Sequence, residues 1–441
     1  MSTSASASPD ERHHVVIIGS GFGGLFAARA LKRAPVRVTL IDRTNHHLFQ
    51  PLLYQVATGI LSEGQIAPPT RDVLRKHRHL RVLLAEVERI DLQTKVVHAD
   101  EFGESLDIGY DSLIIAGGAT SSYFGHDEFR DWSCAMKSLD DALALRGDIF
   151  GSFELAEASR DADERERLMT FVVVGGGPTG VEMAGQLKEL SRRALRNNYR
   201  RIDPRDTRVV LVEGTDHLVN FMGRRLSKMT ERDLTRMGVE VHLSAMVTDM
   251  DEDGVQITHA DDSTERILAA TKIWAAGTRG ASLGSTLARD AGADMDKVGR
   301  LVVNPDCSLP GHPEVFVVGD LMALDDLPGL AEVAIQSGVH AAHTIVRRQE
   351  GKQPKDFHYR DLGTLATISR FRAVAKIGPI QVGGFVGWVL WLVVHITFLT
   401  GFKNRLGALA RWTVSFVGRG RYERALTGPW VARRQRRPKA A

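Results

Sequence analysis

Cysteine is scarce in this sequence. The 441 residues include two cysteines, Cys134 and Cys307, which form no CxxC pair, no metal-ligand spacing and no disulfide framework. This excludes an iron–sulfur cluster held by four thiolates of this chain. We therefore expect no metal among the functional residues.

Acidic residues are nearly missing from the C-terminal part of the chain. After Asp361 the sequence has one acid, Glu423, against fourteen Lys and Arg, so this part carries about +13 and the rest about −10 within a formal net charge of +3. Such a basic segment indicates either an anionic partner, a membrane surface or nucleic acid, or a solvated tail.

An apolar leader is not visible either. Residues 1–14 read MSTSASASPDERHH, and we expect residues 1–13 to be disordered because they are small and polar. Without an apolar h-region this stretch does not read as a secretory signal. We therefore expect the protein in the cytosol or on the inner face of its membrane.

Long apolar runs are missing except over residues 382–402, which contain no charged residue. This run could span a bilayer, but glycines weaken its first helical turn and flanking lysines on both sides give no orientation. The basic residues that follow alternate with Trp412, Val414 and Phe416, as is typical of a segment lying in the membrane surface. We expect firm peripheral binding without a crossing. The residues expected to face headgroups are Arg405, Arg411, Arg419, Arg421 and Arg424, and those expected on the cytoplasmic side are Arg433, Arg434, Arg436 and Arg437.

A strand, a glycine turn and a helix are predicted over residues 14–31. A β-branched apolar run precedes Gly19, Gly21 and Gly24. Their GxGxxG spacing allows a tight turn, a close approach of backbone to a pyrophosphate, and packing of the helix on the strand. The next strand ends at Asp42, 18 residues past Gly24, near the usual place of an acid that binds ribose hydroxyls. The pattern predicts dinucleotide binding.

The same pattern recurs over residues 171–187, with Gly175, Gly177 and Gly180. The next strand ends at Glu213, 33 residues past Gly180, and a long intervening helix accounts for the extra length. A carboxylate followed by Gly and Thr accepts bonds from a free 2′-hydroxyl and repels a 2′-phosphate, so NADH is favoured over NADPH. Two such units in one chain indicate two dinucleotides and hydride transfer between them.

Further elements complete an alternating α/β pattern. Buried strands are predicted over residues 82–90, 110–118, 272–277 and 315–320, and helices over residues 139–165 and 330–347. Residues 43–59 have no clear period, and two interpretations stay open: a cover for a flavin ring, or a connector packed in the core.

Several motifs carry a family resemblance. They are HHLFQPLLYQVATG with IAPP at residues 66–69, then GGGPTGVEMAG, VFVVGD, AIQ and VAKIGP, and an apolar segment ending in GFK. The chain resembles the two-dinucleotide-binding-domain flavoproteins of the glutathione-reductase type. Within them it closely resembles the type II NADH dehydrogenases, single-subunit NADH:quinone oxidoreductases that do not pump protons, in their actinobacterial form.

The resemblance implies an α/β fold with two Rossmann-type dinucleotide-binding domains and a C-terminal membrane-anchoring helical segment. The implied domains are the first part of an FAD domain over 14–124, an NADH domain over 125–295, the second part of the FAD domain over 296–365, and the membrane-associating segment over 366–441. Tightly bound FAD would be held by Gly19, Gly21, Gly24, Asp42, Gly319 and Asp320, with Asp320 on the ribityl chain. NADH, the substrate, would be held by Gly175, Gly177, Gly180 and Glu213.

Three more residues take roles from the resemblance. Glu182 would lie beside the nicotinamide and flavin, Gln336 at the quinone end of the flavin, and Lys376 close to the flavin. The family's AQxAxQ motif has Glu332 in place of its first glutamine, so that position could instead relay protons. His340 falls on the same helix face as Gln336 and is either a proton relay or a packed histidine.

The implied reaction is ping-pong transfer of two electrons from NADH through FAD to a quinone, menaquinone by the actinobacterial resemblance, feeding a respiratory chain. The implied partners are membrane lipid and a second copy of the chain in a homodimer, on the cytoplasmic face of the inner (plasma) membrane. A disulfide or sulfide:quinone reductase is disfavoured because its redox cysteines are missing. A flavin-bearing signalling protein of the apoptosis-inducing-factor kind would use the basic tail on nucleic acid, but the adjoining apolar run favours membrane, and we expect no nucleic acid.

Overall fold

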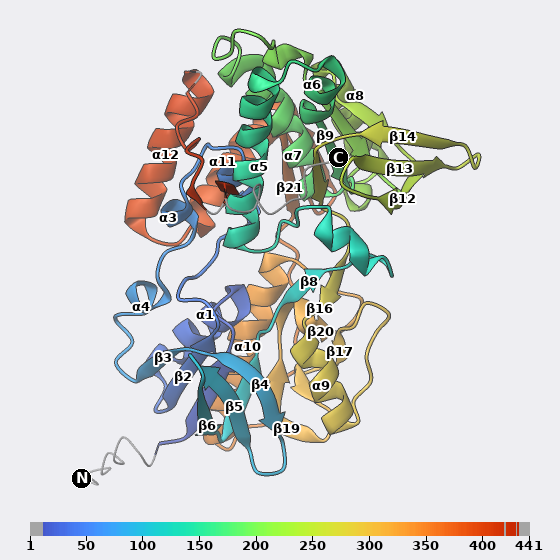
Figure 1. Cartoon of the computed structure of the whole chain (residues 1–441). Coiled ribbons are helices and arrows are strands. Elements are labelled where there is room, and N and C mark those ends of the chain that lie inside the picture. The colour runs from blue at the N-terminus through green and yellow to red at the C-terminus, as the bar shows by residue number, and fades with distance from the viewer. Residues whose placement is uncertain (1–11, 419, 429, 432–441) are drawn as a thin grey trace. The chain divides into compact units, whose positions relative to one another are not determined.

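The computed structural model describes residues 12–418, 420–428 and 430–431 (Figure 1). These residues form two compact units. The first contains residues 12–48, 68–120 and 278–361, and the second contains residues 49–67, 121–277 and 362–431. The predictions for residues 1–11 and for Arg419, Arg433, Arg434, Arg436 and Arg437 lie outside the described residues.

A six-stranded sheet of order β18-β19-β7-β1-β2-β3 forms the centre of the first unit. Its strands are β1 (His14–Ile18), β2 (Arg37–Asp42), β3 (Leu80–Leu84), β7 (Ser112–Ile115), β18 (Ser308–Leu309) and β19 (His312–Val317). All neighbouring pairs are parallel except β18 with β19. The apolar run predicted before Gly19 is β1, which is buried along its whole length, as a strand covered on both faces requires.

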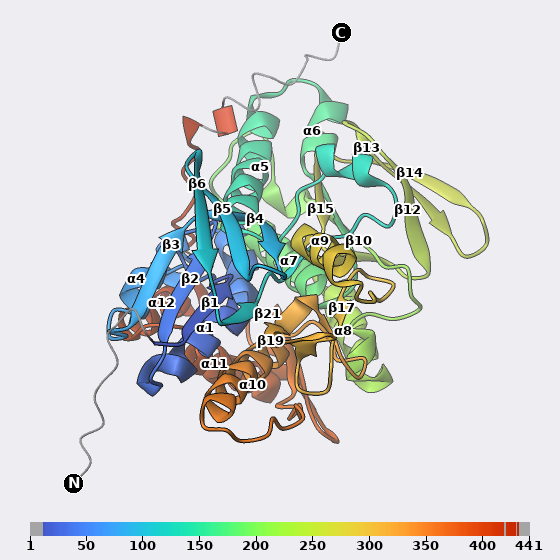
Figure 2. The same ribbon diagram turned by 90° about the horizontal axis from the view of Figure 1, so that it is seen from below.

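Two helices pack together beside this sheet. They are α1 (Phe22–Ala30) and α10 (Ala331–Gln349), which lie side by side (Figure 2). A Cβ on Gly338 would lie 2.3 Å from the carbonyl oxygen of Gly23, so the small residues allow the backbones to touch. This close crossing fixes α10, which carries Gln336, against the helix of the first glycine turn.

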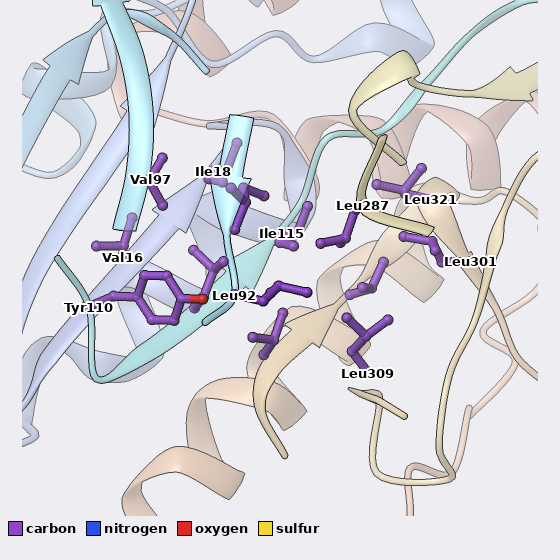
Figure 3. Packing of buried hydrophobic residues seen from close by; sticks show 14 of the residues in the cluster. Val16, Ile18, Leu92, Val97, Tyr110, Ile115, Leu287, Leu301, Leu309 and Leu321 are labelled. Carbon is purple, nitrogen blue, oxygen red and sulfur yellow. The ribbon is translucent and has the colours of Figure 1, made fainter. Parts of the chain in front are cut away.

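The other face of the sheet packs on a core cluster that includes Val97, Ile115 and Leu287 (Figure 3). The elements around it are β4 (Glu86–Asp91), β5 (Val96–Glu101), β6 (Glu104–Gly109) and α9 (Ser282–Ala291). The short pairs are β8 (Ala119–Ser121) with β16 (Thr278–Gly280) and β17 (Leu301–Val302) with β20 (Met322–Ala323). The single strand predicted over residues 82–90 is wrong. The chain leaves the parallel sheet after Ala85, whose N–H donates to Asp42, and Glu86 starts an antiparallel sheet by pairing with Asp100.

The second unit repeats this plan. Its parallel sheet has the order β11-β10-β9-β15, and an antiparallel sheet β12-β13-β14 lies beside it. The strands are β9 (Thr170–Val174), β10 (Arg208–Val212), β11 (Glu240–His242), β12 (Ala245–Met250), β13 (Gly254–His259), β14 (Thr264–Leu268) and β15 (Thr271–Trp274). The longer helices are α5 (Leu139–Ala158), α6 (Ala162–Leu168), α7 (Pro178–Glu189) and α8 (Arg224–Met237).

Two helix predictions in this unit need correction. The helix expected over residues 139–165 is two helices, because Asp161 caps α6 by accepting bonds from the N–H groups of Asp163 and Glu164. The long helix expected between Gly180 and Glu213 ends early: α7 stops at Glu189 and continues as one π-turn, Leu190–Ala194. The short helical turns of the chain are Leu31–Arg33, Gln50–Leu52, α2 (Leu53–Ala57), α3 (Glu63–Ile66), α4 (Thr70–Val73), Asp127–Asp131, Pro204–Asp206, Asn220–Met222 and Gly319–Leu321.

The C-terminal segment belongs to the second unit. It contains β21 (Thr364–Ser369), β22 (Arg372–Ile377), β23 (Ile380–Gly383), α11 (Gly384–Phe398) and α12 (Phe402–Val417). The apolar run of residues 382–402 is therefore divided among a strand end, α11 and the turn before α12. Among the described residues, no helix has both the length and the hydropathy of a membrane span. Arg421, expected to face headgroups, is instead 3% exposed, because its side chain packs against the rest of the unit.

Candidate functional site

In the glycine turn after β1, the first and third glycines have no room for a side chain, whereas the second has open space around it. Gly19 has φ +97°, and a Cβ there would lie 2.4 Å from the carbonyl oxygen of Ala116. A Cβ on Gly24 would lie 1.8 Å from the oxygen of Gly19, whereas one on Gly21 would meet nothing within 4 Å. The first and third glycines therefore serve the turn and the helix packing, and the second leaves backbone open to a ligand.

The turn after β9 repeats these three environments. Gly175 has φ +106° and a Cβ there would lie 2.8 Å from Ala276. A Cβ on Gly180 would lie 1.8 Å from the oxygen of Gly175, and one on Gly177 would again meet nothing within 4 Å. Each unit thus presents one open glycine at the N-terminus of a helix, where backbone N–H groups attract phosphate.

An acid closes each turn in the same way. Oδ2 of Asp42 accepts from the N–H of Ser20 at 2.5 Å, and Oδ1 accepts from the N–H and hydroxyl of Thr44 at 2.7 and 2.8 Å. Oε2 of Glu213 accepts from the N–H of Gly176 at 2.5 Å, and Oε1 accepts from the N–H and hydroxyl of Thr215 at 2.8 and 2.7 Å. These bonds orient both carboxylates, and their other lone pairs suit ribose hydroxyls.

Gly319 and Asp320 follow β19 after one intervening residue, Val318. Gly319 has φ +69°, and its N–H donates to the hydroxyl of Ser337 on α10 at 3.1 Å. Asp320 is half-buried in the turn Gly319–Leu321. Since β19 and β1 both run parallel to β7, Asp320 and the first glycine turn lie at the same edge of the sheet, the edge where such folds bind ligands.

Glu182 is a buried carboxyl on α7, the helix that starts at the second glycine turn. It is 7% exposed, and its Oε1 accepts from the N–H of Thr367 at 3.2 Å. Burial raises the pKa of Glu182 well above its usual range, and the bond from Thr367 offsets only part of that effect. Glu182 is therefore suited to hold a proton at neutral pH.

A buried chain of hydrogen bonds extends from Thr367. Its hydroxyl pairs with the hydroxyl of Tyr54 at 2.8 Å, Tyr54 accepts from Nε2 of Gln55 at 3.0 Å, and Oε1 of Gln55 accepts from Nε1 of Trp412 at 2.6 Å. Each of these four side chains is at most 4% exposed. Burial, followed by the charge of Glu182, raises the pKa of Tyr54 well above its usual range. This series of hydrogen bonds links the surroundings of Glu182 to Trp412 on α12.

Arg421 makes a second link between the C-terminal segment and α7. Its guanidinium donates to the carbonyl and hydroxyl oxygens of Thr58 at 3.1 Å each and to Oε1 of Gln186 at 2.7 Å. Burial lowers the pKa of Arg421 to about 10, and the charge of the nearby Glu189 opposes part of that decrease. Gln186 lies one helical turn after Glu182, so Arg421 supports the same face of α7.

Gln336 holds a loop of the first unit. Its Nε2 donates to the carbonyl of Arg360 at 2.9 Å, and its Oε1 accepts from the N–H of Arg360 at 3.0 Å. Glu332 accepts from the hydroxyl of Tyr359 at 3.4 Å. His340 packs against the ring of Phe357 at a centroid distance of 5.4 Å, and burial lowers the pKa of this histidine. The geometry favours the packed interpretation of His340.

Lys376 lies near the end of β22 in the second unit. Its ammonium donates to the carbonyl of Phe221 at 3.0 Å, so its cation is directed to the turn Asn220–Met222 that precedes α8. Residues 52–61 are buried in the same unit. Of the stretch 43–59, predicted as either a flavin cover or a connector, the second half is therefore buried, whereas residues 43–45 are exposed.

Comparison with known proteins identifies the family. Residues 13–338 match the sequence model of the family described as pyridine nucleotide-disulphide oxidoreductase. Over 425 residues the chain is 49% identical to the type II NADH:quinone oxidoreductase Ndh of Mycobacterium tuberculosis, covering 96% of this chain and 92% of that protein. It is 50% identical over 425 residues to NdhA of the same organism, covering 95% and 90%. The chain belongs to the type II NADH:quinone oxidoreductases.

The structure agrees with this assignment at the level of fold. NDH2 from Plasmodium falciparum, solved in complex with NADH, has a TM-score of 0.86 at 19% identity and covers 93% of this chain and 100% of that one. The predicted resemblance, the α/β fold and the enzyme class are confirmed. FAD and NADH were predicted as cofactor and substrate, and both agree with a family that depends on FAD and with a neighbour that binds NADH.

Several residues of this type II oxidoreductase escaped the sequence analysis. Tyr54 and Gln55 lie within a motif that carried the resemblance, but nothing in that motif shows that their partners are Thr367 and Trp412. Arg421 was read as part of a basic surface because fourteen cations follow Asp361. A signal for it existed in the polar Gln186, which lies one helical turn after Glu182 and needs a partner if that helix face is buried.

Proposed function

We propose that this type II NADH:quinone oxidoreductase holds FAD tightly in the first unit and NADH in the second. It would pass two electrons to menaquinone in a ping-pong order without pumping protons, feeding a respiratory chain. The observation that carries this proposal is the duplicated turn, in which one open glycine and one oriented acid occur in each unit. When bound, FAD supplies hydride acceptance and two-electron release.

The residues of the first unit fit FAD. Gly21 leaves a space that a Cβ would fill, and Asp42 and Asp320 offer acceptors for the ribose and the ribityl chain at one sheet edge. The purified protein should show the absorbance bands of bound flavin and should oxidise NADH faster when a short-chain menaquinone analogue is added. A colourless protein without that acceleration would contradict the proposal.

Glu213 would select NADH over NADPH. Its carboxylate accepts from Gly176 and Thr215, and the residues that follow it are Gly and Thr, with no cation for a 2′-phosphate. Replacing Glu213 by Gln and Thr215 by Arg should raise kcat/KM for NADPH relative to NADH. The matched control is the same pair at Asp42 and Thr44, which should lower FAD content without changing that ratio. Equal use of both nucleotides by the parent protein would refute the role of Glu213.

Glu182 and Gln336 would serve different half-reactions, and Lys376 would lie close to the flavin. Glu182 lies on the helix of the NADH turn and is suited to hold a proton, whereas Gln336 belongs to the other unit and fixes the Arg360 loop. Glu182→Gln should alter flavin reduction by NADH, and Gln336→Ala should mainly slow reoxidation by quinone. Stopped-flow flavin absorbance separates the two steps. Equal effects of both substitutions on both steps would refute the assignment.

The outer faces of α11 and α12 would rest on the membrane. Large apolar side chains with more than a third of their surface exposed gather on these helices. They are Phe385, Val386, Val389, Val393, Leu406, Leu409, Val414 and Val417. Lys403 and Arg405 are exposed beside them, as in helices that lie in an anionic interface. The opposite faces carry the buried Trp391 and Trp412.

Liposome co-sedimentation tests this attachment. A Val389→Glu, Val393→Glu variant should lose binding to anionic vesicles and keep its thermal midpoint, because both positions are exposed. Leu268→Glu, on exposed β14, is the matched control and should sediment like the parent. Undiminished sedimentation of the α11 variant would refute the proposal. We also propose a homodimer and a cytoplasmic orientation, which light scattering and protease access in spheroplasts test.

A further inference from the structure

Two histidines and a glutamate that have no part in the function proposed above converge on the surface of the second unit. His242, His259 and Glu265 each offer one ligand atom, and these atoms all lie within 4.8 Å of one another. The two imidazole rings have centroids 5.5 Å apart, and Nε2 of His259 lies 3.7 Å from Oε2 of Glu265. All three side chains are half-buried, so a small ion can reach them.

Three different strands bring these residues together. His242 ends β11, His259 ends β13, and Glu265 lies in β14. His259 stands opposite Ala245, the first residue of β12, and Ile257 stands opposite Glu265 in the next pair of strands. The ladders fix the three backbone positions, and only side-chain rotations are needed to close the ligand atoms to about 3.3 Å, the separation around a tetrahedral ion.

The neighbouring charges leave Glu265 usable as a ligand. Arg208 is 3.7 Å from Oε1 of Glu265, but its guanidinium is already bound by both carboxylate oxygens of Glu240, at 2.8 to 3.0 Å. The other oxygen, Oε2, faces His259. The ion pair with Arg208 therefore leaves Oε2 of Glu265 available to a metal ion.

We propose that His242, His259 and Glu265 bind one divalent transition-metal ion of the Zn²⁺ class. Two imidazoles and one carboxylate suit zinc and its neighbours better than Mg²⁺ or Ca²⁺, which prefer oxygen ligands. With three protein ligands the fourth position stays open to water. The ligands are 17 and 6 residues apart in sequence, so no short motif marks them. The expectation that no metal is bound rested on the two cysteines alone.

The site adjoins the acid proposed to bind NADH ribose. The carbonyl of His242 accepts from the N–H of Glu213 at 2.9 Å, and the next residues return to the same segment. Ser244 donates to Thr215 at 2.9 Å and Ala245 donates to Glu213 at 3.0 Å. A metal ion on His242 would hold this turn in place. This consequence rests on the proposed function, whereas metal binding itself does not.

Titration of the untagged holoenzyme with ZnCl2 tests the site. Isothermal calorimetry should show one ion per chain, and His242→Gln, His259→Gln and Glu265→Gln should each weaken binding at least about tenfold. The matched control is His98→Gln, another histidine paired with a carboxylate, Asp107, at 2.7 Å. Binding in the parent that these three substitutions leave unchanged, or that His98→Gln removes, would overturn the proposal, as would no binding.

A separate kinetic measurement tests whether the metal ion affects NADH binding through Glu213. With Zn²⁺ at saturation, KM for NADH should change in the parent and stay constant in His259→Gln, while activity without zinc is the same in both. An unchanged KM together with normal zinc binding would refute the link to Glu213 alone. Absence of NADH oxidation in every variant would instead count against the proposed function, while the calorimetry would still decide the metal site.

Discussion

Tyr54→Phe removes one oxygen from the buried chain beside Glu182. The tyrosine hydroxyl pairs with Thr367 at 2.8 Å and accepts from Gln55 at 3.0 Å, and Tyr54 itself is 2% exposed. Phenylalanine keeps the ring packing and leaves the partners in place. The Nε2 donor of Gln55 and the hydroxyl of Thr367 would then lack this partner in a region that water does not reach.

The expected loss follows from these two contacts. A buried polar group left without a partner lowers the free energy of unfolding by about 1–3 kcal/mol. Because both groups belong to one hydrogen-bond network, their losses do not simply add, and we expect a total of about 2–4 kcal/mol. For a unit of this size, about 2 °C of thermal midpoint corresponds to 1 kcal/mol. Tyr54→Phe should therefore lower the midpoint by about 4–8 °C.

Thermal unfolding of the holoenzyme followed by tryptophan fluorescence measures this loss. Tyr422→Phe is the matched control, because that side chain is 67% exposed, and it should shift the midpoint by less than 1 °C or so. Thr367→Val completes a double-mutant cycle whose coupling energy should be about 1 kcal/mol. A midpoint for Tyr54→Phe equal to that of Tyr422→Phe, or no coupling in the cycle, would refute the hydrogen-bond chain.

Three further outcomes follow from the same structure. Glu182→Gln should flatten the decline of stability above about pH 4.5, because burial raises the pKa of Glu182 and only the unfolded chain ionises it there; midpoints measured across pH test this, and parallel curves would contradict it. Gly21→Ala should fold normally yet carry less FAD, which flavin content per folded chain measures. Gly24→Ala should fail to fold because its Cβ would lie 1.8 Å from a carbonyl oxygen, which the yield of folded protein measures. Parent-like flavin content in Gly21→Ala, or a parent-like yield of Gly24→Ala, would contradict this reasoning. Arg421→Met should lower the free energy of unfolding by about 3–5 kcal/mol because it leaves buried partners unpaired. Arg411→Met breaks an ion pair that is about one-third exposed and should lower it by no more than about 1 kcal/mol. Denaturant midpoints that rank the two variants in reverse would exclude a buried Arg421.

Local patterns explain why the glycine turns were predictable from sequence. Positions 19 and 24 must be glycine because a Cβ there would collide with backbone of the same strand–turn–helix unit or of its neighbouring strand. Asp42 stabilises the turn by accepting from the N–H of Ser20. The position of Glu213 could be predicted in the same way, at the end of the strand that follows the second glycine turn, although it lies 33 residues past Gly180. Each of these features depends on strand ends meeting at one sheet edge, which the alternating pattern of strands and helices already implies.

Pairings between distant segments were not predictable. Tyr54 and Thr367 are 313 residues apart, and Gln55 and Trp412 are 357 apart. No period or motif specifies which distant polar group satisfies a buried one. The same limit applies to the break between β3 and β4, where the apolar pattern continues but the chain changes sheets. It applies also to His242 and Glu265, whose strands belong to two different sheets.

The position of α7 changes how the C-terminal segment should be interpreted. The resemblance implied a membrane-associating segment over residues 366–441, yet that segment also packs on α7. A Cβ on Gly185 of α7 would lie 1.7 Å from the carbonyl oxygen of Ile368, and Gln186 accepts from Arg421. The helix that carries Glu182 is thus enclosed by C-terminal residues, with Trp412 reaching the same region through Gln55. A chain cut at residue 380 would expose this polar interior as well as losing its outer apolar face. Loss of quinone reduction in such a chain would therefore report disruption of the second unit, and only substitutions confined to the exposed faces of α11 and α12 separate membrane attachment from folding.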